Sequence, residues 1–578
     1  MRAWVQPDVE SSSAADLVRS LNLPRPIAEL LVRREVRDPE AAEKFLRPRI
    51  EDLPDPWSLK GMEPATERLA RAVARGEPVA LYSDYDVDGV TSAALLQEFF
   101  EAHGLRVHTY IPHRLREGYG LNRDAIEELC AQGFGLMVTL DCGITAVDEV
   151  EHANHLGMDV IVVDHHRCPA ELPAARATLN PHQPGCAYPD KVLAAVGVAF
   201  HLAVALRQRL RRAGHYGSRP EPNLRRLLDL VALGTIADMV PLQGVNRLLA
   251  WHGMAELGRA HRPGIRALLE VCQVRPGRVR GGDVSFKLGP RINAAGRLSD
   301  ARTGVALLTA TDLAAARRHA ATLDAANRDR REVEAQVHAE ALERVTDPEA
   351  PILVAADPSW HPGVVGIVAS KLVERFDRPA VVIGDGGRGS ARTARGLHLY
   401  DALSACAHHL TKFGGHAAAA GFRIPFDRVE AFAEDLERVV ASAQPGGLEE
   451  APLRYDLELG PDALQVGFAK QLRWLEPFGV GNPEPLFRLA PLPLESARLV
   501  GKGQHVKLRV LHGARPVSAI AFRQAELAES LRAGEPVELA GHVEINEFAG
   551  FERVELRVRD ARVPDGDATS APRSLAGV

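Results

Sequence analysis

Carboxylates and imidazoles gather in four short motifs, each of which follows an apolar run. In chain order these residues are Asp84, Asp86 and Asp88, then Asp141, then Asp164, His165 and His166, and finally Asp238. Three carboxylates at alternating positions would repel one another at neutral pH unless cations neutralised them. A solvated acidic turn explains any one motif equally well, but four such motifs in succession favour a divalent-metal site.

The apolar runs before these motifs predict a parallel α/β sheet. Short runs at residues 79–82, 136–140 and 160–163 alternate with helical segments at residues 92–103 and 123–131. Fully buried strands of a parallel sheet read as such continuous apolar runs. Because parallel strands end at one edge, we expect all four motifs, each taken as an acidic strand end, to converge on one crevice. Two divalent ions held there would clamp a phosphoryl group and activate water.

The rest of the chain predicts additional domains, since 578 residues is about four times the ~150-residue scale of a single core. Residues 312–346 contain no glycine or proline, which predicts a helix of roughly 50 Å joining two lobes. A second α/β unit follows, and then alternating strands typical of an OB-like barrel. We place the boundaries at residues 1–50 (helical lead-in), 51–270 (catalytic domain), 271–347 (lobe junction and long helix), 348–448 (second α/β domain), 449–564 (OB-like barrel) and 565–578 (flexible tail).

Composition limits the function classes. The net charge of −6 means that any surface for nucleic acid must be a local basic region. The six cysteines include no CxxC pair, which argues against a zinc finger and for a reducing compartment. The first residues lack the apolar core of a signal peptide, and no apolar run reaches the ~20 residues that span a bilayer. We therefore expect a cytosolic protein without a membrane partner.

The ordered motifs resemble the DHH phosphoesterase superfamily over residues 79–240. Within it, the chain resembles the RecJ family over about residues 50–560. The segments that carry this second resemblance are residues 82–92, 111–120, 289–297, 360–370, 414–417 and 476–483. It implies a single-stranded-DNA-specific 5′-to-3′ exonuclease of DNA repair and recombination, with a DHHA1-like second domain. The alternatives are a small-substrate DHH phosphodiesterase or pyrophosphatase and a non-catalytic single-strand-binding scaffold of replication.

The resemblance also implies roles for the motif residues. It implies that Asp84, Asp86 and Asp141 hold one metal ion, and that Asp88, Asp141, His165 and Asp238 hold a second, each Mn²⁺ or Mg²⁺. His166 is implied to be the catalytic histidine at the scissile phosphate, with Asp164 orienting its neighbours. One position departs from simpler superfamily members, which have a histidine where this chain has Tyr82. Asp84 is then expected to take the place of that histidine.

Substrate contacts are expected from cations, a ring and glycine turns. The candidates are Arg114, Tyr119, Arg280, Arg291, Asn293, Arg297, His361, Ser390, Arg392, Gly414, Gly415 and His416. The guanidinium of arginine can form two hydrogen bonds with phosphate oxygens. An aromatic ring can stack on a base, and a glycine loop exposes backbone amides that bind phosphate. An ordinary glycine turn, and a helix cap for His361, remain alternatives. Expected partners are single-stranded DNA, a single-strand-binding protein and a helicase, and we expect a monomer.

Overall fold

The computed structural model describes residues 3–8, 10–114, 116–298, 300–393, 397–443, 452–548 and 551–564. The tail predicted at residues 565–578 lies outside them. The chain forms two compact units: a larger unit of Pro54–Asp238 and Gly253–Glu450, and a smaller unit of Met1–Leu53, Met239–His252 and Ala451–Val578. Among the described helices, none has the length and apolar character that crossing a bilayer requires.

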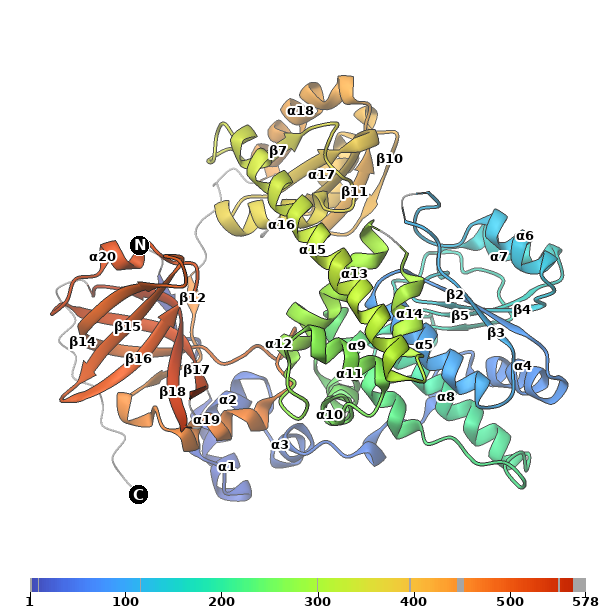
Figure 1. Ribbon diagram of the computed structural model, residues 1–578, viewed down its shortest axis with the longest axis horizontal. Helices are drawn as coiled ribbons and strands as arrows, with labels where there is room; N and C mark the ends of the chain where they lie inside the picture. Colours follow the sequence, from blue (N-terminus) through green and yellow to red (C-terminus); the bar gives the residue numbers. More distant parts are fainter. Residues whose placement is uncertain are drawn as a thin grey trace. The chain divides into compact units, whose positions relative to one another are not determined.

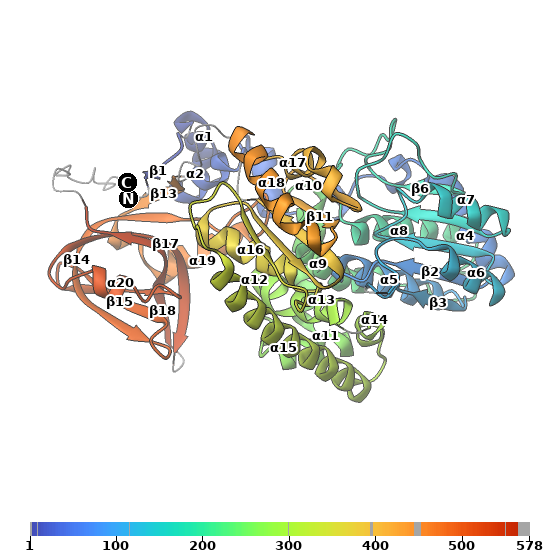
Figure 2. The same cartoon turned by 90° about the horizontal axis from the view of Figure 1, so that it is seen from above.

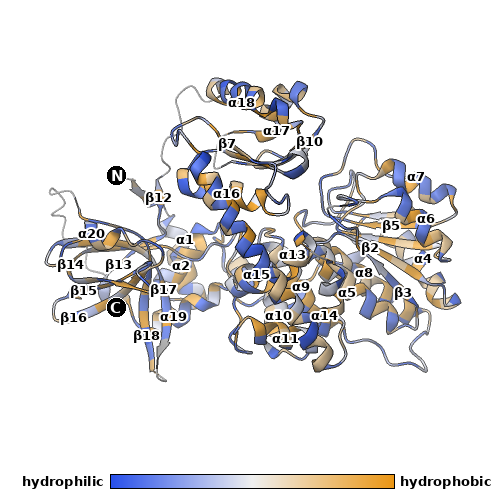
Figure 3. Ribbon diagram, turned by 45° about the horizontal axis from the view of Figure 1, so that its top comes forward, coloured by the Kyte–Doolittle hydropathy of each residue, from blue (hydrophilic) through white to orange (hydrophobic). Residues whose placement is uncertain are grey.

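A five-stranded parallel sheet organises the first part of the larger unit (Figure 1). Its order is β3 (Val107–Tyr110), β2 (Val79–Ser83), β4 (Leu136–Leu140), β5 (Asp159–Val163) and β6 (Ala177–Leu179). The apolar runs at residues 79–82, 136–140 and 160–163 therefore form strands, as predicted. The strands β2 and β4 are buried along their whole length, and Figure 3 shows their apolar character.

Helices cover both faces of this sheet, which explains why its central strands are continuously apolar. On one face lie α6 (Arg123–Ala131) and α7 (Val147–His155), and on the other lie α4 (Met62–Arg75), α5 (Val87–Glu101) and α8 (Ala195–Arg212) (Figure 1). The helix α5 begins immediately after the loop that follows β2. This connection puts the first acidic motif at the carboxyl edge of the sheet.

The fourth acidic motif does not follow a strand. Asp238 lies at the end of a helix, α9 (Leu228–Ala237), which packs against α5 and α8. Nearly every residue of α9 is buried, so the helix lacks the polar face that would have identified it. A short, wholly apolar segment cannot be assigned to strand or helix by periodicity. The expected strand end at this position was therefore wrong.

The predicted connecting helix is α15 (Leu313–Arg344), 32 residues long, which corresponds to about 48 Å. Asp312 caps its start by accepting a hydrogen bond from the backbone amide of Ala315. The helix contacts α11 (Pro263–Val271), α13 (Gly289–Leu298) and α14 (Arg302–Leu308), and also α16 (Val365–Phe376) and β7 (Leu353–Ala356). Figure 2 shows it extending from α16 toward α14.

The second α/β domain contains a mixed sheet. Its order is β10 (Lys412–Gly415), β11 (Ala419–Arg423), β9 (Arg388–Arg392), β8 (Ala380–Gly384) and β7. Only β7 and β8 pair in parallel, and the other pairings are antiparallel. The glycine-rich segments predicted as loops are therefore largely strands, since Ser390 and Arg392 lie on β9 and Gly414 and Gly415 on β10. Glycines within a hairpin produce the same sequence pattern as a flexible loop.

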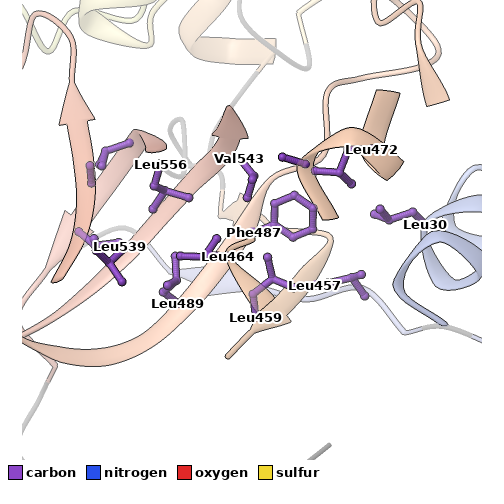
Figure 4. Close-up of a cluster of buried hydrophobic side chains, with 14 of the residues drawn as sticks. Leu30, Leu457, Leu459, Leu464, Leu472, Phe487, Leu489, Leu539, Val543 and Leu556 are labelled. Carbon is purple, nitrogen blue, oxygen red and sulfur yellow. The ribbon is translucent and has the colours of Figure 1, made fainter. Parts of the chain in front are cut away.

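The smaller unit contains the predicted barrel. Its five strands are β14 (Phe487–Val500), β15 (His505–His512), β16 (Arg515–Ala521), β18 (Phe551–Arg562) and β17 (Pro536–Phe548), and the pairing of β14 with β17 closes the barrel. The N-terminal helices α1 (Ser11–Leu21), α2 (Arg25–Arg33) and α3 (Pro39–Leu46) share its hydrophobic core. Figure 4 shows Leu30 of α2 beside Leu472 and Phe487. The predicted lead-in is thus packed with the barrel.

Candidate active site

Three backbone hydrogen bonds bring three of the acidic motifs to the same level of the parallel sheet. The amide of Asp84 donates to the carbonyl of Leu140, at the end of β4, over 3.1 Å. In the same way Asp141 donates to the end of β5, and Asp164 to the end of β6, each over 3.0 Å. Each motif thus extends the ladder of the neighbouring strand. This register explains why carboxylates separated by more than 50 positions meet at one edge.

The first motif is shaped by the start of α5. Asp86 caps this helix, and its Oδ1 accepts hydrogen bonds from the amides of Asp88 (2.9 Å) and Gly89 (3.2 Å). A Cβ atom at Gly89 would lie 2.5 Å from the backbone oxygen of Asp84, so this tight turn requires glycine. The turn holds three carboxylates close together.

Asp88 is fully buried against the start of α8. Its two carboxylate oxygens accept hydrogen bonds from the amides of Ala195 (2.6 Å) and Val196 (2.8 Å). A helix N-terminus favours such an anion. Burial, reinforced by the charge of Asp86, nevertheless raises the pKa of Asp88 to about 7. A neighbouring cation would lower that pKa again and keep the group ionised.

Asp141 follows β4 in a left-handed backbone conformation, with φ of 60°. Such conformations are uncommon outside glycine and cluster at functional sites. The side chain is buried, and burial together with the charges of Asp86 and Asp88 raises the pKa of Asp141 well above its usual range. The backbone therefore holds a buried carboxylate beside like charges, which a cation would neutralise.

The Asp-His-His motif is arranged around Asp164. Its Oδ1 lies 2.7 Å from Nδ1 of His166 and also accepts the backbone amides of His165 and His166. Burial alone would raise the pKa of Asp164, but the hydrogen bond from His166 lowers it. Conversely, burial disfavours the charged imidazole, but Asp164 raises the pKa of His166. The pair therefore favours a carboxylate beside a protonated imidazole.

His165 faces the other carboxylates. Its Nε2 lies 3.2 Å from Oδ1 of Asp141, 3.7 Å from Oδ2 of Asp238 and 4.0 Å from Oδ2 of Asp88. Burial, with a smaller contribution from His166, lowers the pKa of His165 to about 4. The neutral imidazole that results is the form that binds metals. Burial and the charge of Asp88 raise the pKa of Asp238 to about 9.

The donor set fits divalent cations. One buried oxygen each of Asp84, Asp141 and Asp238 accepts no hydrogen bond from the described residues, and unpaired buried carboxylates are costly unless a cation neutralises them. Donor atoms lie within 4.8 Å of one another in three overlapping groups: Asp84, Asp86 and Asp141; Asp88, His165 and Asp238; and Asp141, His165 and His166. Carboxylate oxygens with few imidazoles suit Mn²⁺ and Mg²⁺.

The position that departs from simpler superfamily members takes no part in these groups. The hydroxyl of Tyr82 donates to the carbonyl of Gly120 over 3.0 Å and accepts a hydrogen bond from Asn122. Its ring is buried in the hydrophobic cluster beneath α6. Asp84 instead shares a donor group with Asp86, in keeping with the expected replacement.

The acidic cluster opens into a cavity of about 280 Å³ with a basic side. Its lining residues are Asp84, Tyr85, Asp86, Arg114, Tyr119, Asp141, His166, Asp238, Asn293 and Arg297. The guanidinium of Arg114 lies 5.0 Å above the ring of Tyr85. Burial and the nearby Arg114 lower the pKa of Arg297 to about 10, which leaves it charged at neutral pH. Cations and rings therefore face the carboxylates across one cavity.

Four predicted substrate-binding residues line this cavity: Arg114, Tyr119, Asn293 and Arg297. Asn293 has a second contact, because its Oδ1 accepts a hydrogen bond from the amide of Val87 over 3.0 Å. The cavity lining also contains Tyr85, which was not among the predicted site residues. Its place between Asp84 and Asp86 in the first motif was the signal that could have identified it.

The other substrate-binding candidates lie outside the lining of this cavity. Arg291 pairs with Asp324 over 2.9 Å. Nδ1 of His361 accepts a hydrogen bond from the amide of Gly363, in the turn before α16, whose N-cap is Val364, so His361 is not the cap of that helix. The amide of Arg280 donates to Asp283. The amide of His416 donates to Ala419 within the hairpin that contains Gly414 and Gly415. Ser390 and Arg392 pack near Gly366. Their roles in binding remain predictions.

One further residue, Asn180, positions the Asp-His-His motif, and no pattern in the sequence points to it. Asn180 is fully buried just after β6, and its Nδ2 donates to the carbonyl of His166 over 2.8 Å. Its Oδ1 accepts the amide of His182. An asparagine in a Pro-rich segment looks like an ordinary turn residue, so only the structure shows this contact.

Comparisons with known proteins identify the family and the domains of the chain. Models of the DHH family N-terminal domain, the DHHA1 domain and the RecJ OB domain match residues 78–235, 349–442 and 455–560. The single-stranded-DNA-specific exonuclease RecJ of Dickeya dadantii is 41% identical over 557 residues, which cover 93% of this chain and 96% of that protein. The chain belongs to the RecJ family. The RecJ of Escherichia coli is 39% identical and covers 95% of this chain and 97% of its own length.

Solved structures of the RecJ family share the fold. RecJ from Thermus thermophilus in complex with Mn²⁺ superposes with a TM-score of 0.83 at 32% identity, covering 98% of this chain and 79% of that one. The same protein in complex with Mg²⁺ gives a TM-score of 0.77 at 30% identity, covering 98% and 78%. Both bound metals are ions for which the oxygen-rich donor set of this chain is suited.

Proposed function

We propose that this chain is a single-stranded-DNA-specific exonuclease that degrades strands in the 5′-to-3′ direction in DNA repair and recombination. The observation that carries the proposal is the pairing of two carboxylate-rich donor groups with arginines and tyrosines around one cavity. Phosphodiester hydrolysis needs metals beside the scissile phosphate, and strand binding needs cations and stacking rings. The direction of degradation rests on the family resemblance alone.

The donor groups support the following choice of metal ligands. Asp84, Asp86 and Asp141 would hold one Mn²⁺ or Mg²⁺ ion, and Asp88, Asp141, His165 and Asp238 would hold a second. Bound ions of this kind polarise the phosphate, lower the pKa of water and stabilise the departing oxygen. The fold contributes rigidity, because strand ends and helix starts fix each carboxylate.

His166 supplies a proton in this mechanism. Its Nδ1 is occupied by Asp164, which leaves Nε2 as the nitrogen available to the substrate. Because Asp164 raises the pKa of the imidazole, His166 can carry a proton on Nε2 and donate it to the leaving oxygen. Asp164 orients the imidazole of His166 and favours its protonated form, and Asp164 does not itself contact substrate.

The basic side of the cavity positions the strand. Arg297 and Arg114 face the carboxylates and can bind phosphate oxygens. Tyr119 is 56% exposed, so its ring can stack on a base next to the scissile bond. Neither type of contact reads a base edge, which fits an exonuclease without sequence preference.

Labelled strands test the proposal directly. The full-length protein is incubated with 5′-labelled and 3′-labelled single strands, matched duplexes and a dinucleotide, with Mn²⁺ or Mg²⁺. We expect mononucleotide release from the 5′ end of single strands, slow attack on blunt duplexes and no activity in chelator. Preferred hydrolysis of the dinucleotide would support the small-substrate alternative. Strand binding without hydrolysis under every metal condition would support the scaffold alternative.

Several sequence-based expectations remain predictions. They are contact with a single-strand-binding protein and a helicase, a monomeric state and a cytoplasmic location. Size-exclusion chromatography with light scattering measures the oligomeric state, and the same column run with each purified partner tests the two complexes.

A further inference from the structure

Two histidines and an aspartate meet in the second α/β domain, outside the acidic cavity. His408 and His409 belong to the 3₁₀ turn Ala407–His409, and Asp435 lies on α18 (Val429–Ala443). Their Nε2 atoms lie 3.2 Å and 2.7 Å from the same atom, Oδ2 of Asp435. All three donor atoms lie within 4.8 Å of one another. Two imidazoles and a carboxylate therefore converge on one point.

The surroundings hold these three side chains in place. Arg428 donates to the backbone carbonyl of His408 over 3.1 Å, which fixes the turn. The ring of His409 packs edge-on against Phe432, with centroids 6.2 Å apart. Arg438 pairs with the other oxygen of the aspartate, Oδ1. The oxygen that faces the imidazoles is therefore oriented by contacts outside the cluster, as metal ligands commonly are.

An ion can reach this cluster from solvent. The side chain of His408 is 63% exposed, and an open hollow of about 490 Å³ adjoins it. Cys406 lines the same hollow, but its sulfur does not belong to the group of three donors. The ligand set is therefore two nitrogens and one oxygen, with room for water at the remaining positions.

We propose that His408, His409 and Asp435 form a binding site for a transition-metal ion of the Zn²⁺ class. Imidazole donors favour Zn²⁺, Ni²⁺ and Cu²⁺, whereas Mg²⁺ and Mn²⁺ prefer oxygen donors. Binding requires both rings to place their proton on Nδ1 and present a free Nε2. The site shares no residue with the acidic cavity, and the proposal does not depend on the nuclease activity.

Zinc stoichiometry tests the site. The full-length protein, the variant His408→Gln/His409→Gln and a control, His398→Gln, are dialysed against buffered Zn²⁺ and analysed for bound metal. His398 is a matched control because it pairs with an aspartate, Asp401, over 3.1 Å but has no second imidazole in its pair. We expect the wild type and the control to bind one zinc equivalent more than the double variant. Equal stoichiometry in all three would overturn the proposal and leave the cluster as a hydrogen-bond network.

A second variant distinguishes the loss of a zinc ligand from misfolding. Asp435→Asn keeps an oxygen that can accept hydrogen bonds from the two imidazoles but removes the charge that a cation needs. We expect it to lose the same zinc equivalent while its circular dichroism and the Mn²⁺ dependence of its nuclease activity match the wild type. Full zinc binding by a folded Asp435→Asn variant, or a shifted Mn²⁺ dependence, would contradict an independent site.

Discussion

The two sheets of the larger unit differ in how they arrange functional groups. The parallel sheet brings the first three acidic motifs to one edge, because every strand runs in the same direction and the ladder continues into Asp84, Asp141 and Asp164. In the mixed sheet the candidate substrate-binding residues lie within strands rather than beyond their ends, with Arg392 on β9 and Gly414 on β10. Convergence can therefore be predicted for parallel strand ends, whereas glycine-rich motifs on antiparallel strands need the structure.

The sharpest test of the parallel edge is Asp141→Asn. Because this carboxylate belongs to two donor groups, we expect hydrolysis to fall by about 10³-fold or more, equivalent to several kcal/mol of charge stabilisation. Without metal, the variant should melt at a higher temperature, because it removes a buried charge that repels Asp86 and Asp88. Steady-state rates and metal-free thermal melts provide the measurement, with Asp300→Asn, which pairs with Arg302, as control. Near-normal turnover would refute the shared-ligand arrangement.

His166→Ala tests the division of roles within the same edge. Removing a general acid should lower kcat by about 10²–10⁴-fold, while the Mn²⁺ concentration for half-maximal activity stays nearly constant. A titration of activity with Mn²⁺ separates the two effects. If the variant instead needs much more Mn²⁺ and then recovers its rate, His166 is a metal ligand.

Two arginines of α13 lie in different surroundings, one on the basic side of the cavity and the other in an ion pair. Arg297 lines the cavity, whereas Arg291 pairs with Asp324. Arg297→Ala should raise KM for DNA of every sequence. It should also reduce by about 1 the slope of the logarithm of the binding constant against the logarithm of salt concentration. Arg291→Ala should change both quantities less, because its guanidinium already pairs with Asp324. Binding isotherms at several salt concentrations distinguish the two, and equal effects would contradict the assignment of Arg297 to the DNA.

A smaller effect is expected at Arg392, on the mixed sheet. Burial and the charge of Arg114 lower the pKa of its guanidinium, which places Arg392 within electrostatic range of an arginine that lines the cavity. Arg392→Ala should weaken strand binding less than Arg297→Ala does, with a smaller change in salt slope. The same isotherms measure it. A loss larger than that of Arg297→Ala would place the main phosphate contact on the mixed sheet.

The smallest effect is expected at the hairpin glycines. A Cβ atom at Gly414 meets no atom within 4 Å, whereas one at Gly415 would lie 2.5 Å from the oxygen of Ala419 at a φ of 146°. Gly414→Ala should therefore keep its melting temperature and raise KM only slightly, if its amide contacts phosphate as predicted. Gly415→Ala should lower the melting temperature as well. An unchanged KM in Gly414→Ala would remove this turn from the substrate path.

The sequence by itself determined the strands β2, β4 and β5 of the parallel sheet and supplied the metal-binding candidates. Buried parallel strands have a continuous apolar pattern, and four acidic motifs in succession after apolar runs favour a metal site over four separate solvated turns. The long helix was also predictable, because Asp312 is a good cap and no breaker follows it until Pro348. These features depend on local chemistry and periodicity, which the sequence contains in full.

Tertiary structure alone decided the remaining contacts. The helix before Asp238 is apolar on every side because it is buried on every side, so its type could not be read from its residues. Likewise Arg291 and Arg297 look equivalent in sequence, and only packing gives one an aspartate partner and places the other on the cavity. The physical reason is the same in both cases: the environment of a side chain is set by residues far away in the chain.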